Sequence, residues 1–512
     1  MNLSQKQKNK SVTLLDRIEK VGNILPSPAT LFFGLFLLVI FLSFIFNKLG
    51  TNVTYDAIVN GELQETNVAV RSLLSREGIV YILTSAISNF TGFFALGTVL
   101  TIMLGVGVAD GSGLIAALMR RVALNTPKAL ITSVVIFLGI MSNIASSTGY
   151  VVLVPLGAIL FMAFGRHPIA GLAAAFAGVS GGWSANLLLG SNDPMFAGMS
   201  TAAAQTLNPD YVVQPVSNWY FMLASTFLLT IVGTFVTDKI VEPRLPEYKP
   251  DVLEEAQSVT ANEKRGLKFA GIAALIFLAI ILILVVPKNG LLRNPETNGI
   301  LASPFMSSII LIMMLLFLVP GIAYGYGAGT LKNEKDIIKL MEKTIAGLSS
   351  FIVLIFFAAQ FTSAFEYSNM GIIMSIKGAQ LLQNIGLVGL PLLIIFILLT
   401  AFINIFIAVD SAKWAMMAPI FVPMFMRLNI SPEMTQLAYR IGDSSTNIIA
   451  PLMPFFVLTV DFFQKYDKKA GIGSVVSTML PYSVAFLIGW IIMLSVWYFL
   501  GLPIGPGAPI FY

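Results

Sequence analysis

The sequence predicts an all-α protein that crosses a membrane several times, and three observations support this fold class. Of the 512 residues, 56% are hydrophobic and only 11% are charged, whereas soluble domains carry about 25% charged residues. The chain contains nine long apolar runs, most of them close to the roughly 20 residues that a transmembrane helix needs. Two further stretches are apolar but interrupted by Gly, Pro, Ser and Asn, and they resemble each other.

The apolar runs divide the chain into two membrane halves, 27–237 and 266–500. The polar residues 238–265 carry both charge signs and predict a linker on the cytoplasmic side. Residues 1–26 predict a cytoplasmic N-terminal segment, and 501–512 a C-terminal tail. The first run is too long for the core of a signal peptide, so we expect it to remain as a span. The nine runs lie near residues 27–47, 91–109, 128–144, 218–237, 266–287, 305–326, 348–365, 384–408 and 476–500.

Basic residues predict the orientation, because cytoplasmic loops of membrane proteins carry an excess of lysine and arginine. They cluster before the first span and in three later loops, which places the N-terminus in the cytoplasm and the C-terminal tail outside. These residues are Lys6, Lys8, Lys10, Arg17 and Lys20, then Arg120, Arg121 and Lys128, then Lys332, Lys335, Lys339 and Lys343, and finally Lys465, Lys468 and Lys469.

The composition excludes several classes of function. The chain has no cysteine and a single histidine, His167, which we expect at the tip of a hairpin. Disulfides, thiolate metal sites and Ser-His-Asp catalysis are therefore excluded. No basic run is interleaved with aromatic residues, so we expect no nucleic-acid partner. The sequence lacks the G-x-x-x-x-G-K-[ST] loop of ATP-driven pumps. We therefore expect coupling to an ion gradient, and we expect no organic cofactor.

The two interrupted stretches, 145–200 and 409–462, predict an internal repeat with an offset of roughly 260 residues. In each copy an asparagine precedes a Pro-bounded apolar segment, a short turn follows, and a Ser/Asn-rich element comes last. Such paired, interrupted segments point to the binding site of a secondary transporter, because unwound backbone at membrane depth must be buried in protein or line a cavity. The matching residues are Asn143 and Asn404, Pro155 and Pro419, Pro168 and Pro432, and the segments 181–186 and 442–447.

Charged residues inside apolar segments cost a few kcal/mol each to insert, so the few present are candidates for the transport site. Asp193 follows the Ser/Asn-rich element of the first copy, and Arg440 and Asp443 lie one helical turn apart in the second. The latter two are either a self-neutralising pair or an arginine fork for a substrate carboxylate, with the aspartate free for a cation or proton. We favour the fork, because a Ser-Ser-Thr-Asn break follows Asp443 directly.

Asp410 and Lys413 have the same spacing, and here we expect mutual neutralisation. Trp414, the next residue, suits either core packing or stacking on an aromatic substrate. Asn404 and Asp443 offer hard oxygen ligands. Together with hydroxyl groups and carbonyls, they suit Na⁺, and the carboxylate equally suits a proton.

Several long stretches match one known family, and they include Gly165-Arg-His-Pro and Thr237-Asp-Lys-Ile-Val-Glu-Pro-Arg. On these stretches the chain resembles the p-aminobenzoyl-glutamate transporter (AbgT) family over nearly its full length. Residues 173–182 and 439–444 are more similar to the family's branch linked to sulfonamide antimetabolite efflux. The matching stretches are 89–97, 165–172, 218–222, 237–244, 418–424 and 501–507.

The resemblance implies a homodimer in the bacterial inner membrane, with nine spans and two re-entrant hairpins, near 145–200 and 409–435, in each protomer. Asp410 and Lys413 depart from the family, in which we would expect small or neutral residues. The family's substrate-binding residues fall on Asp193, Ser411, Trp414, Pro432, Arg440 and Asp443, and its sodium ligands on Asn404 and Asp443.

We therefore expect a secondary transporter, coupled to Na⁺ or H⁺, for p-aminobenzoyl-glutamate or related aromatic amides and sulfonamide antimetabolites. Its partners would be this small-molecule substrate and membrane lipid. A Na⁺-coupled dicarboxylate symporter is the alternative, since its paired Ser/Thr/Asn clamps look similar. An ion channel would need a ring of polar residues along one continuous pore, which interrupted hairpins do not offer. An enzyme would have to use Asp193 and Asp443 as a carboxylate pair, but no hydrolase motif flanks them.

Overall fold

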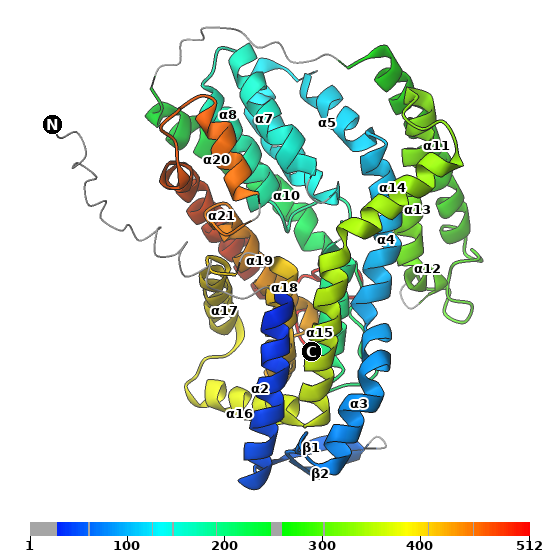
Figure 1. Cartoon of the computed structure of the whole chain (residues 1–512), viewed down its shortest axis with the longest axis vertical. Coiled ribbons are helices and arrows are strands. Elements are labelled where there is room, and N and C mark those ends of the chain that lie inside the picture. The colour runs from blue at the N-terminus through cyan, green and yellow to red at the C-terminus, as the bar shows by residue number, and fades with distance from the viewer. Residues whose placement is uncertain are drawn as a thin grey trace, which may run out of the picture.

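The described chain is almost entirely helical, which confirms the predicted fold class (Figure 1). The predicted N-terminal segment 1–26, with its basic residues, lies outside the described residues. The computed structural model describes residues 28–512 apart from 60–61, 125, 146–147, 191, 247–258, 301–302, 408 and 454.

The first half begins with α2, which packs against α15 of the second half (Figure 1). Its elements are α2 (Pro28–Lys48), β1 (Asn52–Val59), β2 (Glu62–Ala69), α3 (Arg76–Thr91), α4 (Phe94–Gly111), α5 (Leu114–Leu124), η1 (Lys128–Leu130), α6 (Ile131–Ser142), η2 (Asn143–Ala145), α7 (Thr148–Ala163), α8 (Pro168–Phe176), η3 (Ala177–Gly181), α9 (Asn192–Ala204), α10 (Trp219–Val236), η4 (Thr237–Val241) and η5 (Glu242–Arg244).

The second half starts where Thr260 caps a helix, so the predicted linker is helical at both of its ends. Its elements are α11 (Ala261–Val285), α12 (Pro304–Ser307), α13 (Ile309–Ala328), α14 (Glu334–Gly347), α15 (Ser349–Tyr367), α16 (Met370–Asn384), α17 (Gly389–Asn404), α18 (Asp410–Met426), α19 (Pro432–Asn447), α20 (Phe456–Gln464) and α21 (Ile472–Leu500).

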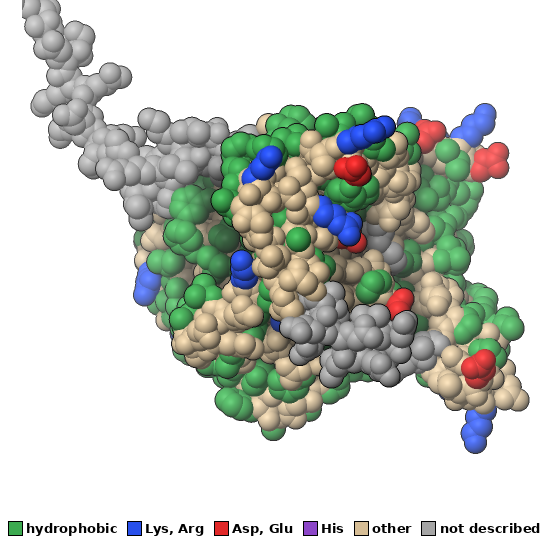
Figure 2. Space-filling model, turned by 90° about the horizontal axis from the view of Figure 1, so that it is seen from below, with side chains coloured by type: hydrophobic (Ala, Val, Ile, Leu, Met, Phe, Trp, Pro, Cys, Tyr) green, Lys and Arg blue, Asp and Glu red, His purple; other side chains and the backbone are tan. Residues whose placement is uncertain are grey.

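Among the described residues, seven helices are long and apolar enough to cross a membrane. The helices α16 and α17 meet at 115° and would make eight if they form one broken span. The count of nine spans stays a prediction, because the apolar helices α6, α7 and α8 are shorter than a full crossing requires. Exposed apolar surface is extensive: Leu275 and Ile283 on α11 are each 69% exposed. Charged side chains on the end that carries β1 and β2 are few and scattered (Figure 2).

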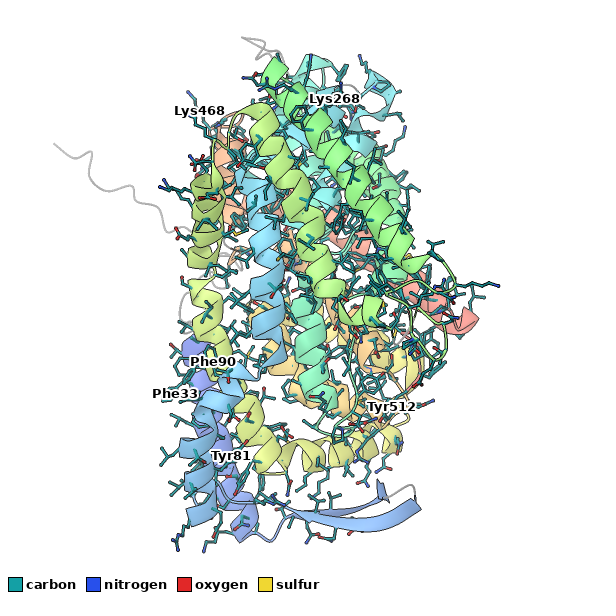
Figure 3. All side chains as sticks on the ribbon, turned by 90° about the vertical axis from the view of Figure 1, so that its right-hand side faces the viewer. Phe33, Tyr81, Phe90, Lys268, Lys468 and Tyr512 are labelled. Carbon is teal, nitrogen blue, oxygen red and sulfur yellow. The ribbon has the colours of Figure 1, made fainter. Side chains whose placement is uncertain are left out.

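An antiparallel hairpin, β1–β2, joins α2 to α3 and was not predicted. It projects at the end of the molecule opposite to Lys268 and Lys468 (Figure 3). The sequence between its strands is Asn60-Gly61, the dipeptide that most favours a two-residue hairpin turn. The expectation of a purely helical chain is therefore wrong for residues 52–69.

The two interrupted stretches share a helix–turn–helix arrangement, which supports the internal repeat, but their Ser/Asn-rich elements differ. Residues 182–186 follow the end of η3 and are not helical, whereas 442–447 form the last turns of α19, so the unwound element predicted for the second copy is wrong. The α7–α8 turn contains Gly165 and the α18–α19 turn contains Asn429, both with positive φ, of 70° and 60°. In the first copy, Nδ2 of Asn143 donates to the carbonyl of Gly182 at 3.1 Å, over 39 residues. In the second, Nδ2 of Asn404 donates to the carbonyl of Asp443 at 2.8 Å, again over 39 residues.

His167 lies at the tip of the first hairpin, as expected, and caps α8. Its Nδ1 accepts a hydrogen bond from the backbone N–H of Ile169 at 3.1 Å. Burial lowers the pKa of the His167 imidazole, which keeps Nδ1 unprotonated and able to accept this bond. The neighbouring Arg166 binds Asp238 in η4 and Glu242 in η5. The histidine is thus a structural cap that helps to anchor the hairpin tip.

Helices α7 and α8 approach closely through glycines, and a side chain at either position should separate them. A Cβ atom on Gly157 would lie 2.5 Å from the carbonyl oxygen of Gly171. We expect Gly157→Ala to destabilise the protein by about 1–3 kcal/mol, measured as a lower unfolding midpoint in detergent. Gly34→Ala in α2 is the matched control, because no atom lies within 4 Å of its Cβ position. Equal midpoints for the two variants would contradict close packing at Gly157.

Candidate functional site

The predicted site residues meet where the two interrupted stretches face each other, around α9, α18 and α19. The helix α19 is fully buried from Pro432 to Asn447. Asp193, Asn404, Trp414, Arg440 and Asp443 are each no more than 2% exposed. Because no charged group of the set reaches solvent, the structure is a closed conformation of the site.

Arg440 binds Asp193 of the other copy. Its Nη1 donates to Oδ1 of Asp193 at 2.7 Å, and both side chains are 2% exposed. The second carboxylate oxygen of Asp193 accepts from the backbone N–H of Gly190 at 2.6 Å. The guanidinium also lies 5.3 Å from the ring centre of Phe196. The reading of Arg440 and Asp443 as a self-neutralising pair is therefore wrong, since the partner comes from α9.

The guanidinium of Arg440 has a hydrogen-bond donor that is not used. Its Nε is buried and has no hydrogen-bond partner among the described residues. Buried donors of this kind are rare in folded proteins and point to an unseen polar partner. Other buried polar atoms without a hydrogen-bond partner among the described residues include Oδ1 of Asn143, Oγ of Ser184 and Oγ of Ser444.

Lys413 pairs with Asp443, and the predicted pair of Asp410 with Lys413 is wrong. The Lys413 ammonium lies 2.5 Å from Oδ1 of Asp443 and also donates to Oδ1 of Asn404. Asp410 is the first residue of α18, and its carboxylate binds the start of that helix and Trp183. Its Oδ1 accepts from the backbone N–H of Ser411 at 2.6 Å, where a helix N-terminus favours a negative charge. Its Oδ2 accepts from the indole N–H of Trp183 at 2.7 Å.

The residues present do not fit a bound Na⁺ in this conformation. The two side-chain oxygens predicted as its ligands, on Asn404 and Asp443, both accept from the Lys413 ammonium. Within the described part of the chain, no cluster of three or more His, Cys, Asp or Glu residues could hold a metal ion.

Trp414 is packed as a core residue in this closed state. It is fully buried, and its indole N–H donates to Oγ of Ser200 at 3.1 Å. Its ring centre lies 4.5 Å from that of Tyr439. Pro432 is the first residue of α19, directly after the capping Ser431.

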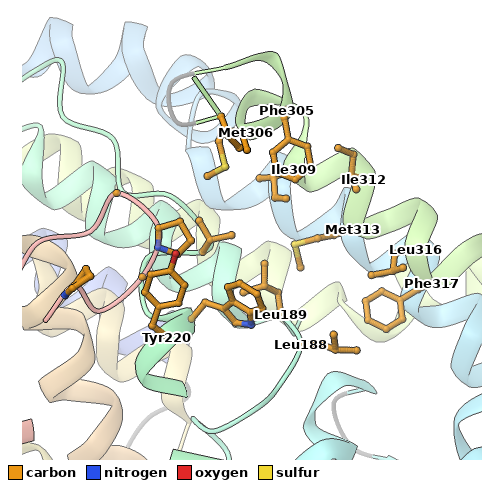
Figure 4. A pocket seen from close by; sticks show the side chains of 17 residues that line it. Leu188, Leu189, Tyr220, Phe305, Met306, Ile309, Ile312, Met313, Leu316 and Phe317 are labelled. Atoms are coloured by element: carbon orange, nitrogen blue, oxygen red, sulfur yellow. The ribbon is translucent and has the colours of Figure 1, made fainter. Parts of the chain in front are cut away.

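Two cavities lie next to the interrupted segments. One, of about 660 Å³, is lined by Ser349, Ser350 and Ser411, beside Asp410. The other, of about 600 Å³, is almost wholly apolar and borders the first copy at Leu188 and Leu189 (Figure 4). Its further lining includes Trp219, Tyr220, Phe305, Met306, Met313 and Phe317. Neither cavity includes Asp193 or Arg440 in its wall, so the ion pair is closed off from both.

The sequence did not assign a role to two residues that connect the copies. Trp183, in the first break, reaches Asp410. Gln436 accepts from Oγ of Ser200 at 2.7 Å and donates to Oδ1 of Asn218 at 2.8 Å. A tryptophan within a Gly/Ser-rich break is a recognisable signal for the first. No local pattern marks Gln436, because both its partners are more than 200 residues away in the sequence.

The AbgT transporter family model matches residues 13–512. The p-aminobenzoyl-glutamate transport protein of Escherichia coli (strain K12) is 40% identical over 490 residues, which cover 96% of this chain and 95% of that protein. The crystal structure of the Alcanivorax borkumensis YdaH transporter superposes with a TM-score of 0.88 at 42% identity, over 94% of this chain and 100% of that one. The structure of Neisseria gonorrhoeae MtrF, from a class of antimetabolite efflux pumps, gives a TM-score of 0.91 at 47% identity, over 97% and 100%.

Proposed function

This chain belongs to the AbgT transporter family, and from that premise we propose that it moves p-aminobenzoyl-glutamate, or related aromatic amides and sulfonamide antimetabolites, by ion-coupled secondary transport. It is a multi-pass membrane transporter and not an enzyme. The observation that carries the proposed substrate is the buried Arg440, which holds one resident carboxylate and keeps a free donor.

Recognition of the substrate carboxylate would be an exchange at this guanidinium. Arginine binds a carboxylate best through two parallel N–H bonds, whereas Asp193 takes one bond from Nη1. A substrate carboxylate could take two parallel bonds from Nε and Nη2, the edge of the guanidinium that does not carry the bond to Asp193, and would then compete with Asp193 for its charge. In the closed pair the protein's own carboxylate thus neutralises the guanidinium that the substrate would bind.

The surroundings of Arg440 suit an aromatic substrate. Phe196 lies against its guanidinium, and the Phe196 and Tyr439 ring centres are 5.8 Å apart. The ring centre of Trp414 lies 4.5 Å from that of Tyr439. Opening of this cluster would expose aromatic faces next to the cation, and an aminobenzoyl ring can pack against such faces. A dicarboxylate without an aryl group would leave these faces uncovered, so we favour the aryl substrate.

Charge balance supports coupling to a cation. The charged side chains that pair within the site are Asp193 with Arg440 and Asp443 with Lys413, and their charges cancel when all four are ionised. A substrate with two carboxylates would add two negative charges in a buried region, where uncompensated charge is costly. A cation that accompanies the substrate would lower this cost. We propose that this requirement couples transport to an ion gradient.

Counterflow in proteoliposomes tests the proposed substrate. Liposomes loaded with unlabelled p-aminobenzoyl-glutamate should accumulate the labelled compound, and an external sulfonamide should compete, whereas succinate should not. Absence of counterflow with correctly inserted protein would refute the proposed substrate. Competition by succinate as strong as by the aryl compounds would favour the dicarboxylate alternative.

We further propose that the protein lies in a bacterial inner membrane as a homodimer, with its N-terminus in the cytoplasm and its C-terminal tail outside. The basic residues Lys268 and Lys468 lie at the opposite end from the β-hairpin (Figure 3), and basic residues favour the cytoplasmic side. The mass of the detergent-solubilised protein tests the dimer.

Single cysteines test the orientation, because the chain has none of its own. In spheroplasts, a membrane-impermeant maleimide should label Asn67→Cys in β2 at once. It should label Lys468→Cys only after the membrane is permeabilised, because that loop faces the cytoplasm. The reverse pattern would show that the orientation is inverted.

A further inference from the structure

We propose that Lys413 is a built-in cation of the transport site. Its ammonium stands between Asn404 and Asp443, where the sequence resemblance places Na⁺ ligands, so this chain needs no Na⁺ to bind or move its substrate. The transport part of this inference rests on the proposed function, whereas the cation-binding part does not.

The ammonium is fully satisfied by oxygen atoms. It donates to Oδ1 of Asp443 at 2.5 Å, to Oδ1 of Asn404, and to the carbonyl of Ile407 at 3.2 Å. A lysine has three N–H donors, and each of them meets a carboxylate, amide or carbonyl oxygen, which are also the donors that bind a small hard cation. The Lys413 side chain has no exposed surface, so the charge is held inside the protein.

The residues around Asn404 hold its side-chain oxygen in a direction that suits a cation. The amide nitrogen of Asn404, which has two N–H donors, lies within hydrogen-bond distance of three acceptors: the carbonyl of Asp443 at 2.8 Å, Oγ1 of Thr446 at 3.0 Å and Oδ1 of Asn447 at 2.8 Å. These contacts turn the Asn404 oxygen toward the Lys413 ammonium. The second copy is thus prearranged around one positive charge, and the lysine supplies it.

The first copy shows what the position looks like without that charge. Asn143 makes the same bond to the carbonyl of Gly182, but a glycine replaces the aspartate there. Oδ1 of Asn143 is buried and has no partner among the described residues. The cation and the carboxylate therefore occur together in the second copy, and the equivalent amide oxygen of the first copy is left without a partner.

A Na⁺ ion cannot share this site with the lysine. It would have to displace the ammonium from Asp443, which would strand a buried positive charge. Binding beside the ammonium would instead place two cations on one carboxylate. The lysine is covalently tethered through α18, so it is present at the site whatever the Na⁺ concentration. The site is therefore selective against Na⁺ as long as Lys413 is in place.

Thermal unfolding of the purified full-length protein tests the cation-binding part. The midpoint is measured in NaCl, KCl and choline chloride at one ionic strength. For the wild type we expect the same midpoint in all three salts. Lys413→Ala frees the oxygens of Asn404 and Asp443, so NaCl should raise its midpoint by about 2 °C or more relative to KCl. The exposed Lys377→Ala on α16 is the matched control and should show no such difference.

A double variant tests whether the Na⁺ response depends on the carboxylate of Asp443. Asp443→Asn added to Lys413→Ala should abolish the Na⁺ response, because the charge that binds the ion is gone. A Na⁺-specific rise in the wild type would overturn the proposal, and this outcome does not depend on whether any variant folds. A folded Lys413→Ala without a Na⁺ response would overturn it as well.

Counterflow tests the transport part. Wild-type exchange of p-aminobenzoyl-glutamate should proceed at equal rates in Na⁺ and K⁺ buffers. A rate that depends on Na⁺ would refute this inference and leave the proposed substrate standing. Lack of exchange in both buffers would refute the proposed substrate, while the unfolding midpoints would still decide whether Lys413 replaces Na⁺.

Discussion

Arg440→Lys should reduce counterflow of p-aminobenzoyl-glutamate roughly 10- to 100-fold while the protein still inserts and folds. Lysine keeps the positive charge beside Asp193 but loses the planar pair of donors that binds a carboxylate. A lost bond to a charged group is worth about 1.5–3 kcal/mol, which sets this range. The measurement is the initial rate of exchange per inserted protein. Arg76→Lys, at the exposed start of α3, is the matched control, and equal rates for the two variants would remove Arg440 from the substrate site.

Asp193→Asn should affect the substrate affinity and the rate of substrate exchange in different ways. If Asp193 and the substrate compete for the same guanidinium, neutralising Asp193 should leave the substrate affinity unchanged or raise it. Exchange should nevertheless slow, because the closed state loses the ion pair that holds α9 to α19. A proportional loss of both affinity and exchange would indicate that Asp193 contacts the substrate directly and is not its competitor.

The second large effect concerns the stability of the buried pair of Lys413 and Asp443. Loss of one partner from a buried pair leaves an uncompensated charge, which costs about 3–5 kcal/mol. Each single alanine variant should therefore unfold more readily than the double variant, Lys413→Ala with Asp443→Ala. Unfolding is to be followed in K⁺ buffer, because we expect Na⁺ to fill the site of the single lysine variant.

The same cycle with Asp410 is the control for that pair. Asp410 binds Trp183 and the backbone of Ser411, so Asp410→Ala and Lys413→Ala should have nearly additive effects. Strong coupling between Asp410 and Lys413, with none between Lys413 and Asp443, would contradict the observed pairing.

Much of the fold could be predicted from the sequence because its signals are local. Apolar runs mark helices, and the recurrence of Asn, Pro and Ser-Asn clusters predicts the repeat, which the matching Asn143 and Asn404 hydrogen bonds support. The β-hairpin also had a local signal, the Asn-Gly at 60–61. Its strands lie outside the apolar runs, so hydropathy alone does not predict it.

The pairing within the site could not be predicted, because it joins residues far apart in the sequence. Arg440 and Asp193 are separated by 247 positions, and Trp183 and Asp410 by 227. Helical spacing gives only the nearest candidates, so Lys413 was assigned to Asp410, three residues away, and not to Asp443 on the next helix. The sequence identified which residues are costly to bury, and the packing of α9 and α18 against α19 decided which of them pair.

We propose that the Arg440 guanidinium recognises the substrate carboxylate. The most direct measurement compares equilibrium binding of p-aminobenzoyl-glutamate with that of its analogue in which both carboxylates are amides, for wild type and Arg440→Lys. The wild type should prefer the carboxylate compound by roughly tenfold or more, and the variant should lose most of this preference. An equal preference in both proteins would show that another group recognises the carboxylate.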